Sequence, residues 1–360
     1  MDWVRGEAVG HGSFGKVNLA IPRKQSAQFF PSMVVKSCGV YHSASLVNEK
    51  KILEELNGCP EIICCFGESY SYENGKNLYN VLLEYASGGS LAEKVRKSES
   101  NKLSEFEVSG YTMGILKGLQ YIHESGYAHC DIKLENILLG EDGKVKIADF
   151  GLANRIGTKK DDDSRCELRG TPLYMSPEVV NGGDQGTPAD IWALGCVVAE
   201  MVAGVPAWKF SGVTELFMAI GVENQLPEIP GELSEEGKDF VGKCFVKDPS
   251  KRWTAEMLLK HPFVADHDHD TVTFNEEIEN GIPSISPRCP FDFPDWVSDE
   301  YDQTSVTCSI TFLPSPENQE KLNLSSGSWF TSPAERLRAL VSEFGPDSDW
   351  YSADDWITVR

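Results

Sequence analysis

The sequence predicts an α+β protein in which strands and one helix come first, a mostly helical region follows, and a largely irregular tail ends the chain. Three observations support this prediction. Residues 3–21 show a strand, a glycine-rich turn and a second strand. Residues 104–125 and 191–264 carry helical patterns of apolar residues. From Ala265 onward the chain is acidic, rich in Ser and Pro, and poor in long periodic stretches.

The glycine-rich turn near the N-terminus has the pattern G-x-G-x-x-G. It consists of Gly10, His11, Gly12, Ser13, Phe14 and Gly15, and Val17 follows one residue later. Alone the pattern is a weak signal, and a tight hairpin turn without a ligand is the alternative interpretation. The residues after it continue as a strand and not as a helix, which counts against a dinucleotide site.

Lys36 ends an apolar strand, where an ammonium group is costly unless it is paired. The helical pattern that follows, residues 44–56, offers three carboxylates. Glu54 and Glu55 are typical of a solvated helix face. Glu49 alone would also suit such a face, so its pairing with Lys36 needs support from elsewhere in the chain.

The stretch from His129 to Asn136 gathers groups suited to phosphoryl transfer in one short loop. Asp131 can accept the proton of a substrate hydroxyl, Lys133 can neutralise phosphoryl charge, and Asn136 can bind a metal through its amide oxygen. Two apolar-rich strands around an Asp-Gly turn follow. This hairpin would bring Asp149 back beside Asn136 as a second metal ligand.

The order H-x-D-x-K-x-x-N and then D-F-G resembles the catalytic core of eukaryotic protein kinases. The resemblance covers about residues 3–264. It implies a bilobal protein kinase fold, with a small antiparallel β lobe plus one helix and a larger, mostly helical lobe, followed by an acidic tail over residues 265–360. It also implies ATP and Mg²⁺ as cofactors. By position, the catalytic residues would be Asp131, Lys133, Lys36 and Glu49, the nucleotide-binding residues Gly10, His11, Gly12, Ser13, Phe14, Gly15, Val17, Lys36, Leu83, Glu84 and Ala86, and the metal ligands Asn136 and Asp149.

Other details follow from the same resemblance. Lys36 would bond the α- and β-phosphates and pair with Glu49. Backbone groups of Glu84 and Ala86 would bond adenine in a hinge between the lobes, with Leu83 guarding the back pocket.

The segment after D-F-G also resembles its kinase counterpart, with Ser-Pro-Glu in place of the usual Ala-Pro-Glu. Thr171 together with Lys133 is the signature of a serine/threonine kinase. Glu178 would form a buried ion pair with Arg252. Asp190 would anchor the catalytic loop, and a helix N-terminal cap is the alternative role for this residue.

Cys130 departs from the kinase pattern, which has an arginine before the catalytic aspartate to bind an activation-loop phosphate. A thiol cannot make that contact. We therefore hypothesise that the chain needs no activation-loop phosphate, so that Thr158 and Ser164 are optional sites. The alternative is a neutral substitution for which Arg155 or Arg169 compensates.

The tail holds four of the eight tryptophans, at positions 296, 329, 350 and 356, which suit either docking anchors for a partner or contacts with the core. Ser332 would cap a short amphipathic helix near residues 333–344, which Gly345 would end. Three Ser-Pro pairs, at Ser286, Ser315 and Ser332, are minimal sites for proline-directed kinases.

Short segments outside the catalytic motifs indicate a narrower class of kinase. Segments such as Gly-Cys-Pro-Glu-Ile-Ile and Gly-Thr-Pro-Leu-Tyr-Met-Ser-Pro-Glu are similar to plant MAP kinase kinase kinases of the MEKK-like class with an N-terminal kinase domain. This similarity implies MAP kinase kinases as substrates, a place in stress or hormone signalling, and a cytoplasmic and nuclear location. The alternatives are a serine/threonine kinase outside the MAP kinase cascade and a pseudokinase scaffold.

Composition limits the partners. The net charge of −22, to which the tail from Ala265 onward contributes 19 acidic and 5 basic residues, argues against nucleic acid and anionic membrane surfaces. The ten cysteines show no zinc-type spacing and suit reduced thiols in the cytosol or nucleus. The N-terminus does not resemble a signal peptide, and because no run of 18 apolar residues occurs, we expect no membrane span.

Overall fold

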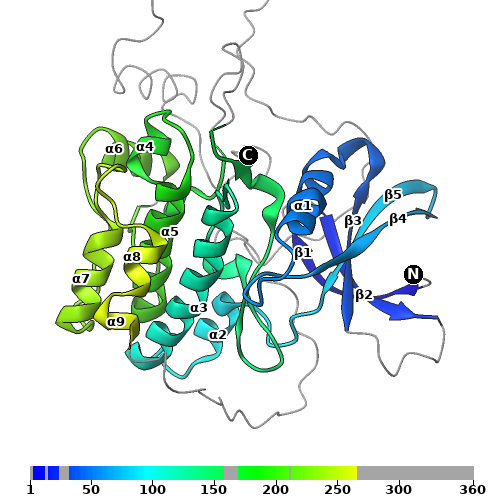
Figure 1. The fold of residues 1–360 in the computed structure, drawn as a ribbon, viewed down its shortest axis with the longest axis horizontal. Helices are drawn as coiled ribbons and strands as arrows, with labels where there is room; N and C mark the ends of the chain where they lie inside the picture. The colour runs from blue at the N-terminus through cyan, green and yellow to red at the C-terminus, as the bar shows by residue number, and fades with distance from the viewer. Residues whose placement is uncertain (1–2, 13–14, 24–31, 158–168, 211, 266–360) are drawn as a thin grey trace, which may run out of the picture.

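The computed structural model describes residues 3–12, 15–23, 32–157, 169–210 and 212–265. These residues form two lobes that lie side by side, a smaller one built on a sheet and a larger one built of helices (Figure 1). The α+β prediction is therefore confirmed. The predictions about the tail, namely its helix, its tryptophans and its Ser-Pro pairs, concern residues outside the described ones.

The sheet of the smaller lobe has five antiparallel strands in the order β1-β2-β3-β5-β4. The strands are β1 Trp3–Gly12, β2 Gly15–Pro22, β3 Met33–Gly39, β4 Cys65–Glu73 and β5 Lys76–Glu84. Asn74 and Gly75 join β4 to β5 with φ angles of 49° and 80°. Positive φ at both central residues is the geometry that favours Asn-Gly in two-residue hairpin turns.

The two faces of β3 pack against different apolar clusters. Met33 and Val35 pack with Leu82 in a small apolar cluster on one face of the sheet. Val34 belongs to the main core on the other face. Because side chains alternate along a strand, Lys36 shares the face of Val34 and points toward the helix that covers it.

β3 continues past Lys36 to Gly39, because its ladder with β5 extends over the whole strand. The prediction that Lys36 ends its strand is therefore wrong. One 3₁₀ turn, η1 (Val40–His42), leads into α1 (Ala44–Glu55). Glu49 lies on the buried face of α1.

The larger lobe is assembled from helices, four of which begin at a side-chain hydroxyl cap. The helices are α2 Leu91–Lys97, α3 Glu105–Glu124, α4 Pro177–Val180, α5 Thr187–Ala203, α6 Val213–Gly221, α7 Glu235–Cys244, α8 Ala255–Leu259 and α9 Pro262–Ala265. Ser90, Ser104, Ser234 and Thr254 each accept a backbone N–H at the start of a helix. At the start of α3, Ser104 and Glu107 form a capping box, in which each side chain accepts a backbone N–H of the other residue.

α5 lies at the centre of this lobe, and nearly all of its residues are buried. Its N-cap is Gly186, so Asp190 lies inside the first turn and makes no capping hydrogen bond. The cap alternative for Asp190 is therefore wrong, and its carboxylate is available to the neighbouring loop.

Short elements between α3 and α4 shape the catalytic region. They are β6 Tyr127–Ala128, η2 Leu134–Asn136, β7 Ile137–Leu139, β8 Val145–Ile147, η3 Phe150–Leu152, β9 Asn154–Arg155 and η4 Pro172–Tyr174. β6 pairs with β9, and β7 pairs with β8. One apolar core continues from the sheet of the smaller lobe through these elements into the helices.

Candidate active site

Lys36 lies between two carboxylates that come from separate elements. Its Nζ is 2.7 Å from Glu49 Oε2 in α1 and 2.9 Å from Asp149 Oδ1, just before η3. Lys36 is 4% exposed and Glu49 is 0% exposed. The pair predicted between Lys36 and Glu49 is therefore present, with Asp149 as a second partner.

The attraction between Lys36 and the two carboxylates keeps Lys36 and Asp149 charged. Burial alone would lower the pKa of Lys36, but the carboxylates of Asp149 and Glu49 outweigh it and raise the pKa. Burial alone would raise the pKa of Asp149, but the Lys36 ammonium outweighs it and lowers the pKa. Burial raises the pKa of Glu49 despite the same ammonium. Lys36 and Asp149 are thus held as ions at neutral pH.

The catalytic loop is anchored to the larger lobe through Asp190. The backbone N–H groups of His129 and Cys130 each donate to its carboxylate at 2.8 Å. His123 Nε2 lies 2.9 Å from the same carboxylate. This is the anchoring role that the kinase resemblance implied for Asp190.

Asp131 is surrounded by groups that fix its orientation. Thr171 Oγ1 donates to Asp131 Oδ1 at 2.8 Å, and Lys133 Nζ is 3.1 Å from Oδ2. Lys133 also donates to Thr171 Oγ1 at 3.0 Å. Burial alone would lower the pKa of Lys133, but Asp131 outweighs it and raises the pKa. Lys133 is therefore a cation beside the carboxylate.

Asn136 and Asp149 approach each other through the β7–β8 hairpin. The N–H of Ala148, the residue before Asp149, donates to the carbonyl of Asn136 at 2.9 Å. The side-chain nitrogen of Asn136 donates to Asp131 O at 2.8 Å and to Asp131 Oδ2 at 3.0 Å. With its nitrogen engaged, Asn136 presents its amide oxygen as an acceptor. An amide oxygen and an ionised carboxylate are ligands that suit Mg²⁺.

The strand register gathers the other predicted nucleotide residues near Lys36. Val17 lies opposite Lys36, and Leu83 lies opposite Val34. A Cβ on Gly15 would lie 2.4 Å from Ser37 O, so the close approach of β2 to β3 requires glycine there.

The rest of the predicted nucleotide set lies in β1 and after β5. Gly10, His11 and Gly12 pair with β2, while Ser13 and Phe14 lie outside the described residues. The side chain of Glu84 is engaged, because it accepts the Cys64 N–H at 3.1 Å and lies 2.8 Å from Lys146 Nζ. Glu84 is the last residue of β5, and the buried Ala86 lies two residues later in the link to the larger lobe.

A family model described as a protein kinase domain matches residues 3–264. The chain belongs to the protein kinase family. Mitogen-activated protein kinase kinase kinase 20 of Arabidopsis thaliana is 47% identical over 369 residues, covering 100% of both chains. Mitogen-activated protein kinase kinase kinases 18 and 17 of the same plant are each 36% identical, covering 100% of this chain and 99% and 93% of their own.

The end of the kinase activation segment is held by a bidentate ion pair. Arg252 Nη1 and Nη2 lie 2.7 and 2.9 Å from the two carboxylate oxygens of Glu178. Arg252 is 5% exposed. The predicted buried pair is therefore present, and it ties α4 to the segment between α7 and α8.

Cys130, which stands where kinases usually have arginine, is buried and has a φ of 68°. Its Sγ lies 3.5 Å from Ala128 O. Arg155 lies over the ring of Tyr127 at 5.9 Å. Thr158 and Ser164 lie outside the described residues, so the hypothesis about activation-loop phosphate stays a prediction.

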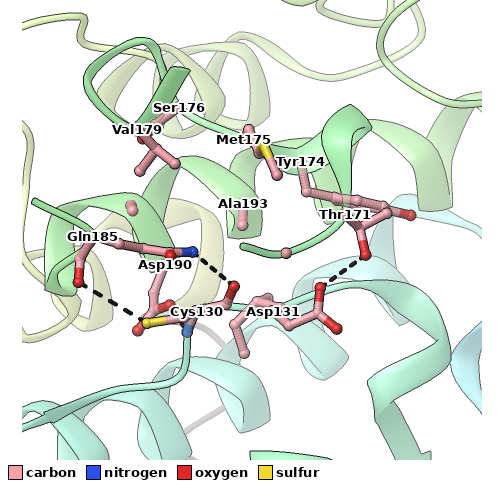
Figure 2. A pocket seen from close by; sticks show the side chains of 13 residues that line it. Cys130, Asp131, Thr171, Tyr174, Met175, Ser176, Val179, Gln185, Asp190 and Ala193 are labelled. Atoms are coloured by element: carbon pink, nitrogen blue, oxygen red, sulfur yellow. Dashed lines mark hydrogen bonds between the residues drawn. The ribbon is translucent and has the colours of Figure 1, made fainter. Parts of the chain in front are cut away.

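Sequence reasoning missed Gln185 and Glu200. Figure 2 shows Gln185 at one side of a pocket and Thr171 at the other, with the side chain of Gln185 directed at Cys130. Glu200 of α5 accepts a hydrogen bond of 2.5 Å from the hydroxyl of Tyr174. Neither residue belongs to a motif the sequence analysis used, and both act through contacts between segments far apart in the chain.

The described residues also bear on membrane and metal binding. Among them, no helix is long and apolar enough to cross a bilayer. The same residues contain no group of three or more His, Cys, Asp or Glu side chains placed to hold a metal ion.

Proposed function

We propose that this serine/threonine protein kinase acts as a MAP kinase kinase kinase, transferring the γ-phosphate of Mg-ATP to Ser or Thr of MAP kinase kinases. The observation that carries the proposal is the arrangement of Asp131, held between Thr171 and Lys133 at 2.8 and 3.1 Å. The names of relatives that match over the full chain support the substrate class.

Each residue of the site has a part that follows from its contacts. Asp131 would accept the proton of the substrate hydroxyl, because Thr171 and Lys133 hold its carboxylate in one orientation. Lys133 would offset charge on the phosphoryl group as it moves. Lys36, held by Glu49, would position the α- and β-phosphates.

Asn136 and Asp149 would hold the Mg²⁺ through an amide oxygen and a carboxylate. Bound Mg²⁺ would neutralise negative charge on the phosphate oxygens. Val17, Leu83 and Ala86 would line the adenine site, with the glycine-rich turn covering the phosphates.

The cellular setting is part of the proposal. The similarity to plant kinases of this class suggests stress or hormone signalling in the cytoplasm and nucleus. Residues 265–360 would form an acidic regulatory or docking tail outside the kinase domain of residues 3–264. The net charge of −22 suits protein partners better than nucleic acid or membrane.

The proposal is tested with purified full-length protein, radiolabelled ATP, purified MAP kinase kinases and a generic substrate, beside a Lys36→Met control. We expect label on the MAP kinase kinases well above the generic substrate, and background with the control. Label on the generic substrate alone would indicate a kinase outside the cascade. Background labelling of every substrate by the wild type would favour the pseudokinase scaffold and overturn the proposal.

A further inference from the structure

Gln185 binds two segments that meet at Asp131. It lies in the loop between α4 and α5, and its side-chain nitrogen donates to Cys130 O at 2.9 Å and to Arg169 O at 3.2 Å. Cys130 belongs to the catalytic loop, His129 to Asn136. Arg169 lies in the last part of the activation segment, just before Gly170-Thr171-Pro172. One neutral amide therefore joins these segments, as Figure 2 shows for the bond to Cys130.

We propose that Gln185 is a positioning residue. It holds the last part of the activation segment, at Arg169, against the loop that carries Asp131, and thereby keeps the Thr171 hydroxyl in place beside the Asp131 carboxylate. The proposal rests on the kinase function proposed above and adds a residue to its machinery. Gln185 acts through Thr171 and Cys130 and would touch neither the nucleotide nor the transferred phosphoryl group.

The two segments approach too closely to tolerate a side chain between them. Gly170 has a φ of 109°, and a Cβ there would lie 2.9 Å from Cys130 O and 3.5 Å from Gln185 Nε2. The contact is thus made of backbone and one amide group. Because the backbone of Gly170 is intrinsically free to rotate, an external hydrogen bond is needed to hold it in one conformation.

Gln185 also supports an unfavourable backbone conformation. Cys130 has a φ of 68°, which costs energy for a residue with a side chain. Its N–H donates to Asp190 at 2.8 Å, and its carbonyl accepts from Gln185 at 2.9 Å. Since the peptide units on both sides of the Cys130 Cα are hydrogen-bonded, the direction in which the chain runs into Asp131 is fixed.

The consequence falls on Thr171. Arg169 is two residues away, and the Thr171 hydroxyl donates to Asp131 at 2.8 Å and accepts from Lys133 at 3.0 Å. A movement of about 1 Å at Arg169 would break contacts of this length, and misplacement on that scale can cost about 100-fold in rate. Lys36, by contrast, is held by Glu49 and Asp149 and would stay in place.

The test compares Gln185→Leu, which keeps much of the volume and removes both donors, with Asp184→Asn, its exposed neighbour in the same loop. For the full-length protein with Mg-ATP and a MAP kinase kinase, we expect Gln185→Leu to lower kcat/KM for the protein substrate about 10- to 100-fold. The Kd for ATP should stay within about twofold, and Asp184→Asn should match the wild type.

Gln185→Glu adds a second measurement, the pH dependence of activity, which would not change if Gln185 had only a packing role. An ionised carboxylate at this place has no donor, whereas a protonated one can donate to one of the two carbonyls. Its activity relative to the wild type should therefore rise between pH 8 and pH 6. The same ratio for Gln185→Leu should stay flat, because Asp131, Lys133 and Asp190 are common to all the proteins compared.

The outcomes separate this inference from the proposed function. A wild type that fails to phosphorylate any substrate would overturn both. An active wild type matched within twofold by Gln185→Leu would overturn the role of Gln185 alone. So would a parallel loss of ATP affinity and melting temperature in Gln185→Leu together with a pH-independent Gln185→Glu, because these would indicate general destabilisation.

Discussion

The nucleotide side and the substrate side of the active site are stabilised by different interactions. On the nucleotide side, Lys36 is buried between Glu49 and Asp149, at 2.7 and 2.9 Å. On the substrate side, Asp131 has one cationic partner, Lys133 at 3.1 Å, and two neutral ones, the Thr171 hydroxyl at 2.8 Å and the Asn136 amide at 3.0 Å. Buried ions fail when one partner is removed, whereas neutral contacts fail when the backbone that carries them moves. The two sides should therefore respond differently to substitution.

On the nucleotide side, the largest effect is expected from Lys36→Met. This change leaves Glu49 and Asp149 without their cation and removes the group proposed to hold the phosphates. We expect kcat/KM for phosphoryl transfer to fall roughly 100- to 1,000-fold, together with weaker ATP binding. Steady-state kinetics and a nucleotide titration measure both. Activity within threefold of wild type would show that the ion group is structural only.

A smaller loss is expected on the substrate side from Thr171→Val. Valine has the shape of threonine but cannot donate to Asp131 or accept from Lys133. We expect kcat for the protein substrate to fall about 10- to 100-fold with unchanged ATP affinity, because hydrogen bonds to charged groups are lost. Thr171→Ser is the control, since it keeps the hydroxyl and should retain most activity. Equal losses in both variants would argue for packing as the role of Thr171.

Glu200 allows a prediction of how the free energy of unfolding depends on pH. Unlike Asp149, it is bound to a hydroxyl, that of Tyr174, and burial raises its pKa from 4.5 to about 7. Between these values the folded protein keeps a proton that the unfolded chain has lost. The free energy of unfolding contributed by Glu200 therefore falls as pH rises from about 4.5 to 7.

Glu200→Gln removes this titration. The free energy of unfolding of Glu200→Gln minus that of the wild type should be more positive at pH 8 than at pH 5, by roughly 1–3 kcal/mol. Denaturant unfolding at the two pH values measures the change. Glu215→Gln, an exposed change on α6, is the control and should show no such trend. A pH-independent difference for Glu200→Gln would contradict the raised pKa.

The smallest effect is expected from the double change Thr158→Ala and Ser164→Ala. Cys130 cannot bind an activation-loop phosphate, so activity should stay within about twofold of the wild type. Assays with protein purified after phosphatase treatment provide the control. A collapse of the double variant to background would reject the hypothesis and would indicate that Arg155 or Arg169 takes over the role of the missing arginine.

The contrast between the two sides also explains what the sequence could predict. Asp131, Asn136 and Asp149 were found because ionic and metal-binding groups recur at fixed spacings in short motifs, and the pairing of Lys36 with Glu49 followed from the kinase resemblance. The long helix predicted over residues 104–125, which the structure shows as α3, followed from its local apolar pattern in the same way. Local chemistry thus accounted for most of the fold and for the charged half of the site.

The remaining features depend on contacts between distant segments. Gln185 meets Cys130 across 55 positions, and its amide gives no sign in the sequence of what it binds. Lys36 was expected to end its strand, but pairing with β5 carries β3 on to Gly39. The alternative role of Asp190 as a helix cap was wrong because the N-cap of α5 is Gly186, four residues earlier. Such details are set by tertiary packing and not by local preference.

The most direct test of the account is Asp131→Asn, measured as single-turnover transfer of labelled phosphate from ATP to a MAP kinase kinase. An amide keeps the shape of the carboxylate but cannot act as the proton acceptor. We predict a rate roughly 100- to 10,000-fold below wild type with unchanged ATP affinity. Transfer at the wild-type rate would contradict the central claim that Asp131 is the group that activates the substrate hydroxyl.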